Sequence, residues 1–192
     1  MRKPRPSCLH PGQGAVMDTG VVIVDYGAGN LRSVAKALEK VGFPGKVTQA
    51  PNEVLRARGV ILPGVGSSGS AMAALQERGL VEPLREVVAL GTPFFGVCLG
   101  MQLLLEGSEE DPRPCLGILK GRVKRFAPGL KVPHMGWNQV SFAREHPIFQ
   151  GVPSGSFFYF VHSYYAEPMD DSVTLGKTEY GVTFCSALAT GN

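Results

Sequence analysis

The sequence lacks long apolar runs, cysteine-rich motifs and a strong excess of charge of either sign. None of its apolar runs reaches the roughly twenty residues that a membrane-spanning helix needs, so we expect no such helix. The formal net charge of +3, without a long basic run, does not predict nucleic acid as a partner. Its four cysteines match no zinc-binding spacing and are too few for a disulfide-dense secreted domain. We therefore expect a cytoplasmic protein with reduced thiols and neither metal nor cofactor.

Residues 1–19 show no hydrophobic periodicity and no apolar core of a secretory signal peptide. Met17 stands just before the first apolar run, which favours a start codon assigned too early. The rest of the sequence contains no linker-like stretch, and the composition of the 192-residue chain is that of a folded protein. We interpret residues 1–19 as an unpatterned leader and residues 20–192 as one domain.

The first half of the sequence alternates between short β-branched runs and amphipathic segments. Asn30 can cap the first helix, and Gly42 can end it. This order predicts a parallel sheet with helices on both faces. The expected strands are 21–24, 46–49, 60–62 and 92–97, and the expected helices are 31–41, 71–80, 84–90 and 99–106.

The second half has a different pattern, in which apolar and aromatic runs are separated by Gly, Pro and Asp. We interpret these runs as added, partly antiparallel strands of the same domain. The predicted fold class is therefore α/β, with three layers and a mostly parallel central sheet flanked by helices. The expected additional strands are 116–126, 137–142, 157–165, 173–175 and 182–188.

The most informative segment is Phe94–Gln102, in which a predicted strand passes through Gly-x-Cys-x-Gly into a helix. This is the arrangement of a nucleophile elbow, with the sulfur of Cys98 in place of a serine oxygen. Gly96 and Gly100 remove Cβ atoms that would collide in the sharp turn. A following helix would favour the thiolate of Cys98, and the N–H of Leu99 could donate to an oxyanion. The alternative is an inert core cysteine.

A second Gly-rich turn, Pro63–Gly66, follows another predicted strand. Ligands of open α/β sheets bind at the carboxyl ends of the strands, so this turn is expected to lie beside Cys98. Its backbone N–H groups could complete an oxyanion hole. A plain connecting loop is the alternative.

At this point the sequence resembles the class I glutamine amidotransferases, because Gly96–Gln102 matches their elbow. Three further segments resemble one family among them, the glutaminase subunits of imidazole glycerol phosphate synthase, which act in histidine biosynthesis. These segments are Asp25–Leu31, Pro133–Asn138 and Tyr159–Tyr165, and the resemblance covers roughly residues 21–192 in order and spacing.

The resemblance implies a reaction and its residues. Cys98 would attack the side-chain amide of glutamine, release ammonia and form a glutamyl thioester that water hydrolyses. Gly66 and Leu99 would supply the oxyanion N–H groups. The residues at positions that hold the glutamine are Gln102, Glu110 and Ser163.

The resemblance also implies a partner. Ammonia would pass to a cyclase subunit, a (β/α)8 barrel in a heterodimer with this chain, which makes imidazole glycerol phosphate and an aminoimidazole carboxamide ribotide. Trp137, Asn138 and Tyr159 match positions near that interface. The alternative for these aromatic residues is ordinary packing.

Several other residues have a structural interpretation by default. His134 and His162 are expected to be structural histidines, and the resemblance makes neither of them the general base. The cations of Lys120–Arg125 indicate a solvated strand edge, with a partner or phosphate contact as the alternative. Cys8, Cys115 and Cys185 are expected to be structural or incidental.

The sequence departs from the family in two places. Ser68 stands where relatives usually carry an aromatic residue. In the family, a pair like Gly191-Asn192 leads into a strand with His-Pro-Glu and a last helix, whereas this sequence stops there. Because the base and its orienting glutamate would then be absent, we expect slow turnover and low stability of the chain as given. The sequence could be a fragment, which we favour, a truncated product, or a binding subunit without catalysis.

Two rival functions therefore remain beside the glutaminase. One is an amidotransferase for a different acceptor, against which Pro133–Asn138 argues. The other is a non-catalytic regulatory or interaction protein on the same fold.

Overall fold

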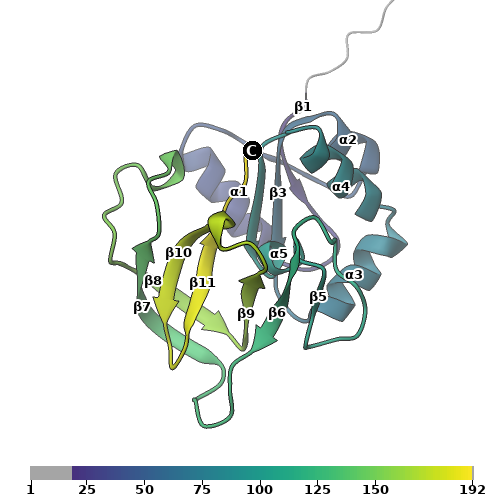
Figure 1. Ribbon diagram of the computed structural model, residues 1–192. Helices are drawn as coiled ribbons and strands as arrows, with labels where there is room; N and C mark the ends of the chain where they lie inside the picture. Colours follow the sequence, from purple (N-terminus) through teal and green to yellow (C-terminus); the bar gives the residue numbers. More distant parts are fainter. Residues whose placement is uncertain (1–18, 192) are drawn as a thin grey trace, which may run out of the picture.

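The computed structural model describes residues 19–191 and forms an α/β fold with two sheets (Figure 1). One sheet has the strand order β2-β1-β3-β4 and is entirely parallel, and we call it the parallel sheet. The other has the order β5-β6-β9-β11-β10-β7-β8 and is antiparallel except for the β5–β6 pair, and we call it the mixed sheet. The predicted fold class is confirmed. The predicted leader lies almost wholly outside the described residues.

The parallel sheet forms where the sequence is richest in β-branched residues. Val22, Val24, Val60 and Leu62 are fully buried on it, as expected for a sheet covered on both faces. In register, Val22 pairs with Val60, and Gly64 pairs with Cys98 at the carboxyl ends. Its strands are β1 Thr19–Val24, β2 Lys46–Thr48, β3 Ala57–Gly64 and β4 Phe94–Cys98.

Helices lie on both sides of this sheet, with α1 on one side and α2, α3 and α4 on the other (Figure 1). The Asn30 side chain caps α1 by accepting a hydrogen bond from the Ser33 N–H at 3.2 Å, as the sequence predicted. Leu75, Leu80 and Leu84 pack into the core beneath the sheet. The helices are α1 Leu31–Lys40, α2 Pro51–Leu55, α3 Ser68–Glu77, α4 Val81–Ala89 and α5 Leu99–Gln102. None of the helices in residues 19–191 has the length and apolar character to cross a membrane.

The mixed sheet contains the added strands and has a small core of its own around Leu105, Val123 and Ala166. Two short 3₁₀ helices, Pro147–Phe149 and Asp171–Val173, connect its strands. The strands are β5 Gly107–Ser108, β6 Gly121–Arg125, β7 His134–Phe142, β8 Ser156–His162, β9 Tyr164–Pro168, β10 Thr174–Glu179 and β11 Thr183–Leu188.

Three expectations about elements were wrong in extent. The helix expected over 99–106 ends at Gln102, because the carbonyls of residues 103–105 accept hydrogen bonds from residues 116–118 instead. The same bonds hold residues 116–118 out of the strand that was expected to begin there. The strand expected over 157–165 is interrupted at Ser163 and forms β8 and β9. Helix α2 was not expected.

The first turn of α5 lies unusually close to β3. A Cβ on Gly100 would overlap the carbonyl group of Leu62, and a Cβ on Gly96 would lie 2.7 Å from the carbonyl oxygen of Gly100. A Cβ on Gly64 would lie 2.8 Å from both the Gly100 nitrogen and the Leu99 Cβ. The glycines around Cys98 are therefore required by backbone contact, as the elbow pattern predicted.

We predict that Gly100→Ala destabilises the protein by about 3 kcal/mol, the upper end of overpacking effects, because the neighbour is a backbone carbonyl. Gly20→Ala is the matched control, since nothing lies within 4 Å of its Cβ position. Urea unfolding of both variants measures the difference. Equal stability of the two variants would contradict the close approach of α5 to β3.

Candidate active site

Cys98 stands at the junction of β4 and α5 in a strained backbone conformation. Its φ of 55° and ψ of −113° lie in a region that non-glycine residues rarely adopt, and within residues 19–191 no other non-glycine residue has positive φ. Such strain persists only where the surroundings impose it, and it is concentrated at functional sites.

The environment of Cys98 favours the thiol over the thiolate. The side chain is reachable from a cleft, yet protein atoms surround it on most sides, and this burial raises the pKa of the thiol. The N–H of Leu99 hydrogen-bonds the sulfur and lowers the pKa by a smaller amount. The N–H at the start of α5 thus favours the thiolate, as the sequence predicted, but the desolvation is the larger effect.

One cavity of about 560 Å³ collects the residues that the sequence singled out as an active site. It lies at the carboxyl ends of β3 and β4, the usual ligand position in an open α/β sheet. Asn30 and Pro133, from two of the family-like segments, also line it. The predicted nucleophile, oxyanion residues and glutamine-holding residues on its wall are Cys98, Gly66, Leu99, Gln102, Glu110 and Ser163.

The predicted oxyanion loop lies directly beside the nucleophile, because Gly64 is the strand partner of Cys98. Gly66 has φ of 86°, a conformation that glycine adopts without strain. The hydroxyl of Tyr26 lies 2.8 Å from the Cβ position of Gly64 and has no hydrogen-bond partner among residues 19–191. Burial raises the pKa of Tyr26 to about 12, and the nearby Cys98 adds to this effect. Tyr26 therefore packs against the loop as an uncharged side chain.

Gln102 and Glu110, predicted to hold glutamine, are fixed through their side chains, and Ser163 is fixed through its backbone. The Nε2 of Gln102 donates to the Tyr164 carbonyl at 2.9 Å, which leaves its Oε1 as the acceptor available to a ligand. One carboxylate oxygen of Glu110 accepts the Ser68 N–H at 2.7 Å, at the start of α3. The Ser163 carbonyl accepts the Phe126 N–H at 3.2 Å. Ser68, where relatives usually carry an aromatic residue, is buried beneath Glu110.

No base contacts the Cys98 sulfur within residues 19–191. His162 also lines the cavity, but its Nδ1 pairs with the Tyr164 carbonyl at 2.9 Å and its Nε2 with His134 at 3.0 Å. Glu110 is engaged with Ser68. Neither imidazole nor carboxylate of this part of the chain therefore serves as the hydrogen-bonded partner that a Cys–His site requires. Both nitrogens of His162 have partners, as expected for a structural histidine.

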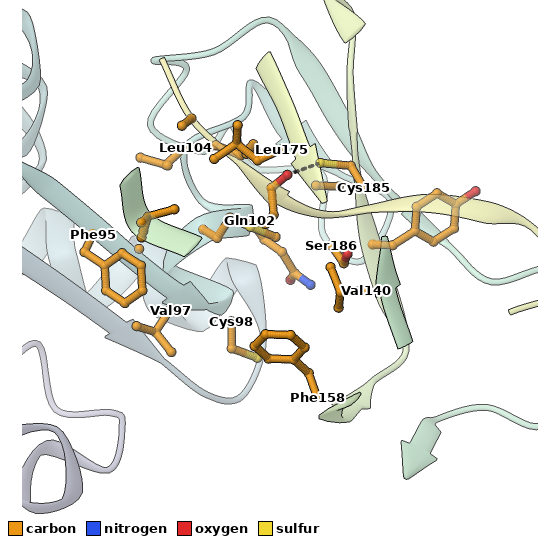
Figure 2. A pocket seen from close by; sticks show the side chains of 18 of the residues that line it. Phe95, Val97, Cys98, Gln102, Leu104, Val140, Phe158, Leu175, Cys185 and Ser186 are labelled. Carbon is orange, nitrogen blue, oxygen red and sulfur yellow. Dashed lines mark hydrogen bonds between the residues drawn. The ribbon is translucent and has the colours of Figure 1, made fainter. Parts of the chain in front are cut away.

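A second, apolar cavity of about 580 Å³ meets the first at Cys98 and Gln102. It lies between β4, the edge strand of the parallel sheet, and β11 of the mixed sheet. Figure 2 shows Cys98 and Gln102 on its wall together with Phe95, Val140 and Leu175. Of these two cavities, the first contains Gly64, Gly66 and Glu110 and the second does not, which makes the first the better site for a polar substrate.

The predicted interface residues lie on two faces of the ribbon formed by β7 and β8, because successive side chains of a strand point to opposite faces. Trp137 and Tyr159 are paired in register, have ring centroids 5.5 Å apart, and are 69% and 55% exposed. Asn138 points to the opposite face, where its Nδ2 donates to the Glu179 carbonyl at 2.8 Å. Two of the three predicted interface residues thus lie on an open surface, and the third is half-buried.

The inward face of this ribbon holds a pair of histidines that the sequence did not reveal as a pair. His134 and His162 are partners in register on β7 and β8. The ring of His134 stacks on that of Tyr180, with the centroids 3.9 Å apart. Phe126 packs edge-on against His162, and Phe184 packs against it at a tilt. Burial lowers the pKa of both imidazoles, so both are neutral near pH 7. Only the strand register could have revealed this contact.

Other residues singled out by the sequence lie elsewhere. The cationic run 120–125 was expected at a sheet edge, but β6 lies between β5 and β9. Its Lys124 pairs with Glu109 at 3.2 Å and Glu167 at 3.9 Å, which favours the structural interpretation. Cys115 and Cys185 are buried. Across residues 19–191, no group of three or more His, Cys, Asp or Glu side chains could hold a metal ion.

Comparison with known proteins gives a consistent picture. Residues 22–190 match the family model described as "Glutamine amidotransferase class-I". The imidazole glycerol phosphate synthase subunit HisH of Moorella thermoacetica is 53% identical over 173 residues, covering 90% of this chain and 82% of that protein. The protein of the same name from Dehalococcoides mccartyi is 52% identical over 167 residues, covering 86% and 82%.

Solved structures share the fold at lower identity. A crystal structure of a glutamine amidotransferase aligns with a TM-score of 0.66 and 22% identity, over 84% of this chain and 86% of that one. The structure of PurLQS from Thermotoga maritima aligns with a TM-score of 0.64 and 20% identity, over 84% and 75%. At these identities the alignments show a common fold.

We predict that acid destabilises this protein through the histidine pair. Since the folded-state pKa of His134 and His162 is lowered, the unfolded chain binds more protons, and stability falls as the pH decreases below about 6.5. Proton NMR titration, with each resonance assigned from a His→Gln variant, measures both values. Titration of either buried imidazole above the unfolded value would contradict this account.

Proposed function

Because the chain belongs to the class I glutamine amidotransferases and, within them, to the family of imidazole glycerol phosphate synthase subunit HisH, we propose that it hydrolyses glutamine to glutamate and ammonia for histidine biosynthesis. The observation that carries this proposal is the single cavity in which the strained Cys98 meets the glycine loop, Gln102 and Glu110. A cleft with a nucleophile and convergent polar groups suits a small polar substrate.

The proposed reaction begins with the thiol of Cys98. Its sulfur attacks the side-chain amide carbon of glutamine, and the negative charge that develops on the amide oxygen is stabilised by the N–H groups of Gly66 and Leu99. The proton given up by the thiol passes to the amide nitrogen, collapse of the intermediate breaks the carbon–nitrogen bond, and ammonia leaves with a glutamyl thioester remaining on Cys98. Water then attacks the thioester, which regenerates the thiol and releases glutamate.

The substrate's own charges match the predicted contacts. The α-amino group of glutamine is cationic, and the Oε1 of Gln102 and the carboxylate of Glu110 are the acceptors that this wall of the cavity offers. Ser163 contributes to the same wall from the break between β8 and β9. We assign these three residues to holding the amino-acid part of glutamine.

The chemical step needs a proton acceptor for the thiol, and residues 19–191 supply none at the sulfur. The raised pKa of Cys98 makes this requirement stronger, because little thiolate forms spontaneously. Loss of a general base costs about 10²–10⁴ in rate. Without such a base, the reaction is expected to be slower by that factor.

We propose that the partner of this subunit is a cyclase with a (β/α)8-barrel fold, in a heterodimer, and that the exposed face of the β7–β8 ribbon contacts it. Trp137 and Tyr159 provide large, rigid, exposed aromatic area, which is typical of interface anchors. Ammonia released at Cys98 would be used by that cyclase to make imidazole glycerol phosphate and the ribotide.

A binding-only subunit without catalysis is the alternative function. The observation that favours it is the chemistry of Cys98, whose thiol is held protonated without a hydrogen-bonded base in the described part of the chain. Such a subunit would bind the cyclase and leave glutamine unchanged.

We predict that an electrophilic glutamine analogue, such as a chloromethyl ketone, captures Cys98 and that Cys98→Ala abolishes the capture. Cys115→Ala is the matched control and retains it, because Cys115 is buried. Intact-mass and peptide-mass measurements identify the labelled residue. A folded chain that binds the cyclase but ignores both the label and glutamine would establish the binding-only alternative.

We predict that Trp137→Ala and Tyr159→Ala each weaken cyclase binding more than tenfold, the effect of losing about 2 kcal/mol at an interface anchor. Phe43→Ala is the control, since Phe43 is 66% exposed beside β2, at the edge of the other sheet. Calorimetric titration of the cyclase gives the dissociation constants. Equal effects of all three substitutions would exclude this face as the docking surface.

A further inference from the structure

The histidine pair is connected to the candidate active site through one carbonyl group. The Tyr164 carbonyl accepts two hydrogen bonds at 2.9 Å, one with the Nδ1 of His162 and one from the Nε2 of Gln102. Gln102 lies four residues after Cys98 and lines the same cavity. Any group that fixes the Tyr164 carbonyl therefore also fixes the Gln102 carboxamide.

The hydrogen bonds around the pair permit a single arrangement of protons. A carbonyl oxygen only accepts, so the Nδ1 of His162 must carry a proton. In the neutral ring the Nε2 of His162 then accepts, and the Nδ1 of His134, 3.0 Å away, must donate to it. The Nε2 of His134 is left as an acceptor, and it faces the Nδ2 of Asn138 at 3.4 Å.

The far end of this chain of hydrogen bonds is held by Asn138. Its Nδ2 donates to the Glu179 carbonyl at 2.8 Å, and its Oδ1 accepts the Gln139 N–H at 2.8 Å. These two bonds fix which end of the amide faces His134, so the tautomer of each ring is determined by backbone groups. Every polar atom in the series has a matching partner, which is the condition under which a buried polar network gives rigidity.

We infer that His134 and His162 form a tautomer-locked relay from Asn138 to the Tyr164 carbonyl, and that this relay positions Gln102 to present its Oε1 to the substrate. The inference rests on the proposed function for the identity of that substrate, glutamine. His134 and His162 are positioning residues, because neither contacts Cys98 within the described structure. The relay acts on substrate binding rather than on the reactivity of the thiol.

The aromatic packing around the pair supports this role. His134 lies between the rings of Phe160 and Tyr180, with interplanar angles of 22° and 23°. Phe126 contacts His162 edge-on with centroids 5.1 Å apart. This packing limits rotation of the imidazoles to other partners, most strongly at the buried His134.

The test compares two reactions of Cys98 in the 192-residue chain. A chloromethyl ketone analogue of glutamine reports binding through its half-saturation concentration, and iodoacetamide reports the reactivity of the thiol alone. His162→Phe removes the donor to the Tyr164 carbonyl, whereas His162→Asn keeps an N–H at the position of Nδ1. Phe184→Leu removes a ring from the same cluster without removing a hydrogen bond of the relay.

We predict that His162→Phe raises the half-saturation concentration of the analogue about 3- to 10-fold, the value of one net hydrogen bond. The iodoacetamide rate stays within about twofold, since thiol chemistry is unchanged. His162→Asn recovers most of the loss, and Phe184→Leu has a smaller effect than His162→Phe. Equal effects of His162→Phe and Phe184→Leu, or no effect of His162→Phe, would show a role in packing only.

A second measurement separates this inference from the proposed function. If the parent chain reacts with iodoacetamide but not with the analogue, the glutaminase proposal fails, and the relay is then judged by NMR alone. Nitrogen-15 shifts should show both imidazoles protonated at Nδ1, and His162→Phe should shift the side-chain amide signals of Gln102. An Nε2-protonated ring, or unshifted Gln102 signals, would overturn the relay.

Discussion

The close approach of α5 to β3 is the constraint from which the candidate active site follows. At Gly100 the helix backbone touches the Leu62 carbonyl region, and at Gly64 the strand touches Leu99 in return. Between these contacts Cys98 has a φ of 55°. Cys98 therefore lies at the sheet edge next to the Gly64–Gly66 loop. The same backbone contact brings the nucleophile and the proposed oxyanion donors close together.

The same geometry has two opposing effects on the ionisation of the Cys98 thiol. The short α5 supplies one hydrogen-bonding N–H from Leu99, while the surrounding protein removes water from the sulfur. Desolvation is the larger effect, so the thiol keeps its proton. A nucleophile in this state depends on a general base, and the elbow alone positions the sulfur without activating it.

Sequence patterns predicted the features that depend on local backbone chemistry. The elbow, the capping role of Asn30 and the turn after β3 follow from glycine, side-chain capping and β-branched runs, all of which act within a few residues. The end of α5 at Gln102 was not predictable from local sequence. The carbonyls of residues 103–105 accept hydrogen bonds from residues 116–118, which are distant in the sequence. Helix α2 was missed because its five residues, which begin at Pro51, are too short for a periodic pattern.

Pairs of residues across strands are the part of the site that no local pattern reveals. His134 and His162 lie 28 residues apart in sequence, and their contact exists only because β7 and β8 pair in this register. A shift by one residue would expose both imidazoles and bury Trp137 and Tyr159 in their place. The alternation of the two strands thus gives the ribbon an aromatic surface on one face and a neutral histidine pair on the other. Because both sets depend on one register, any contact that stabilises the pairing of β7 with β8 also maintains the hydrogen bonds that reach Gln102.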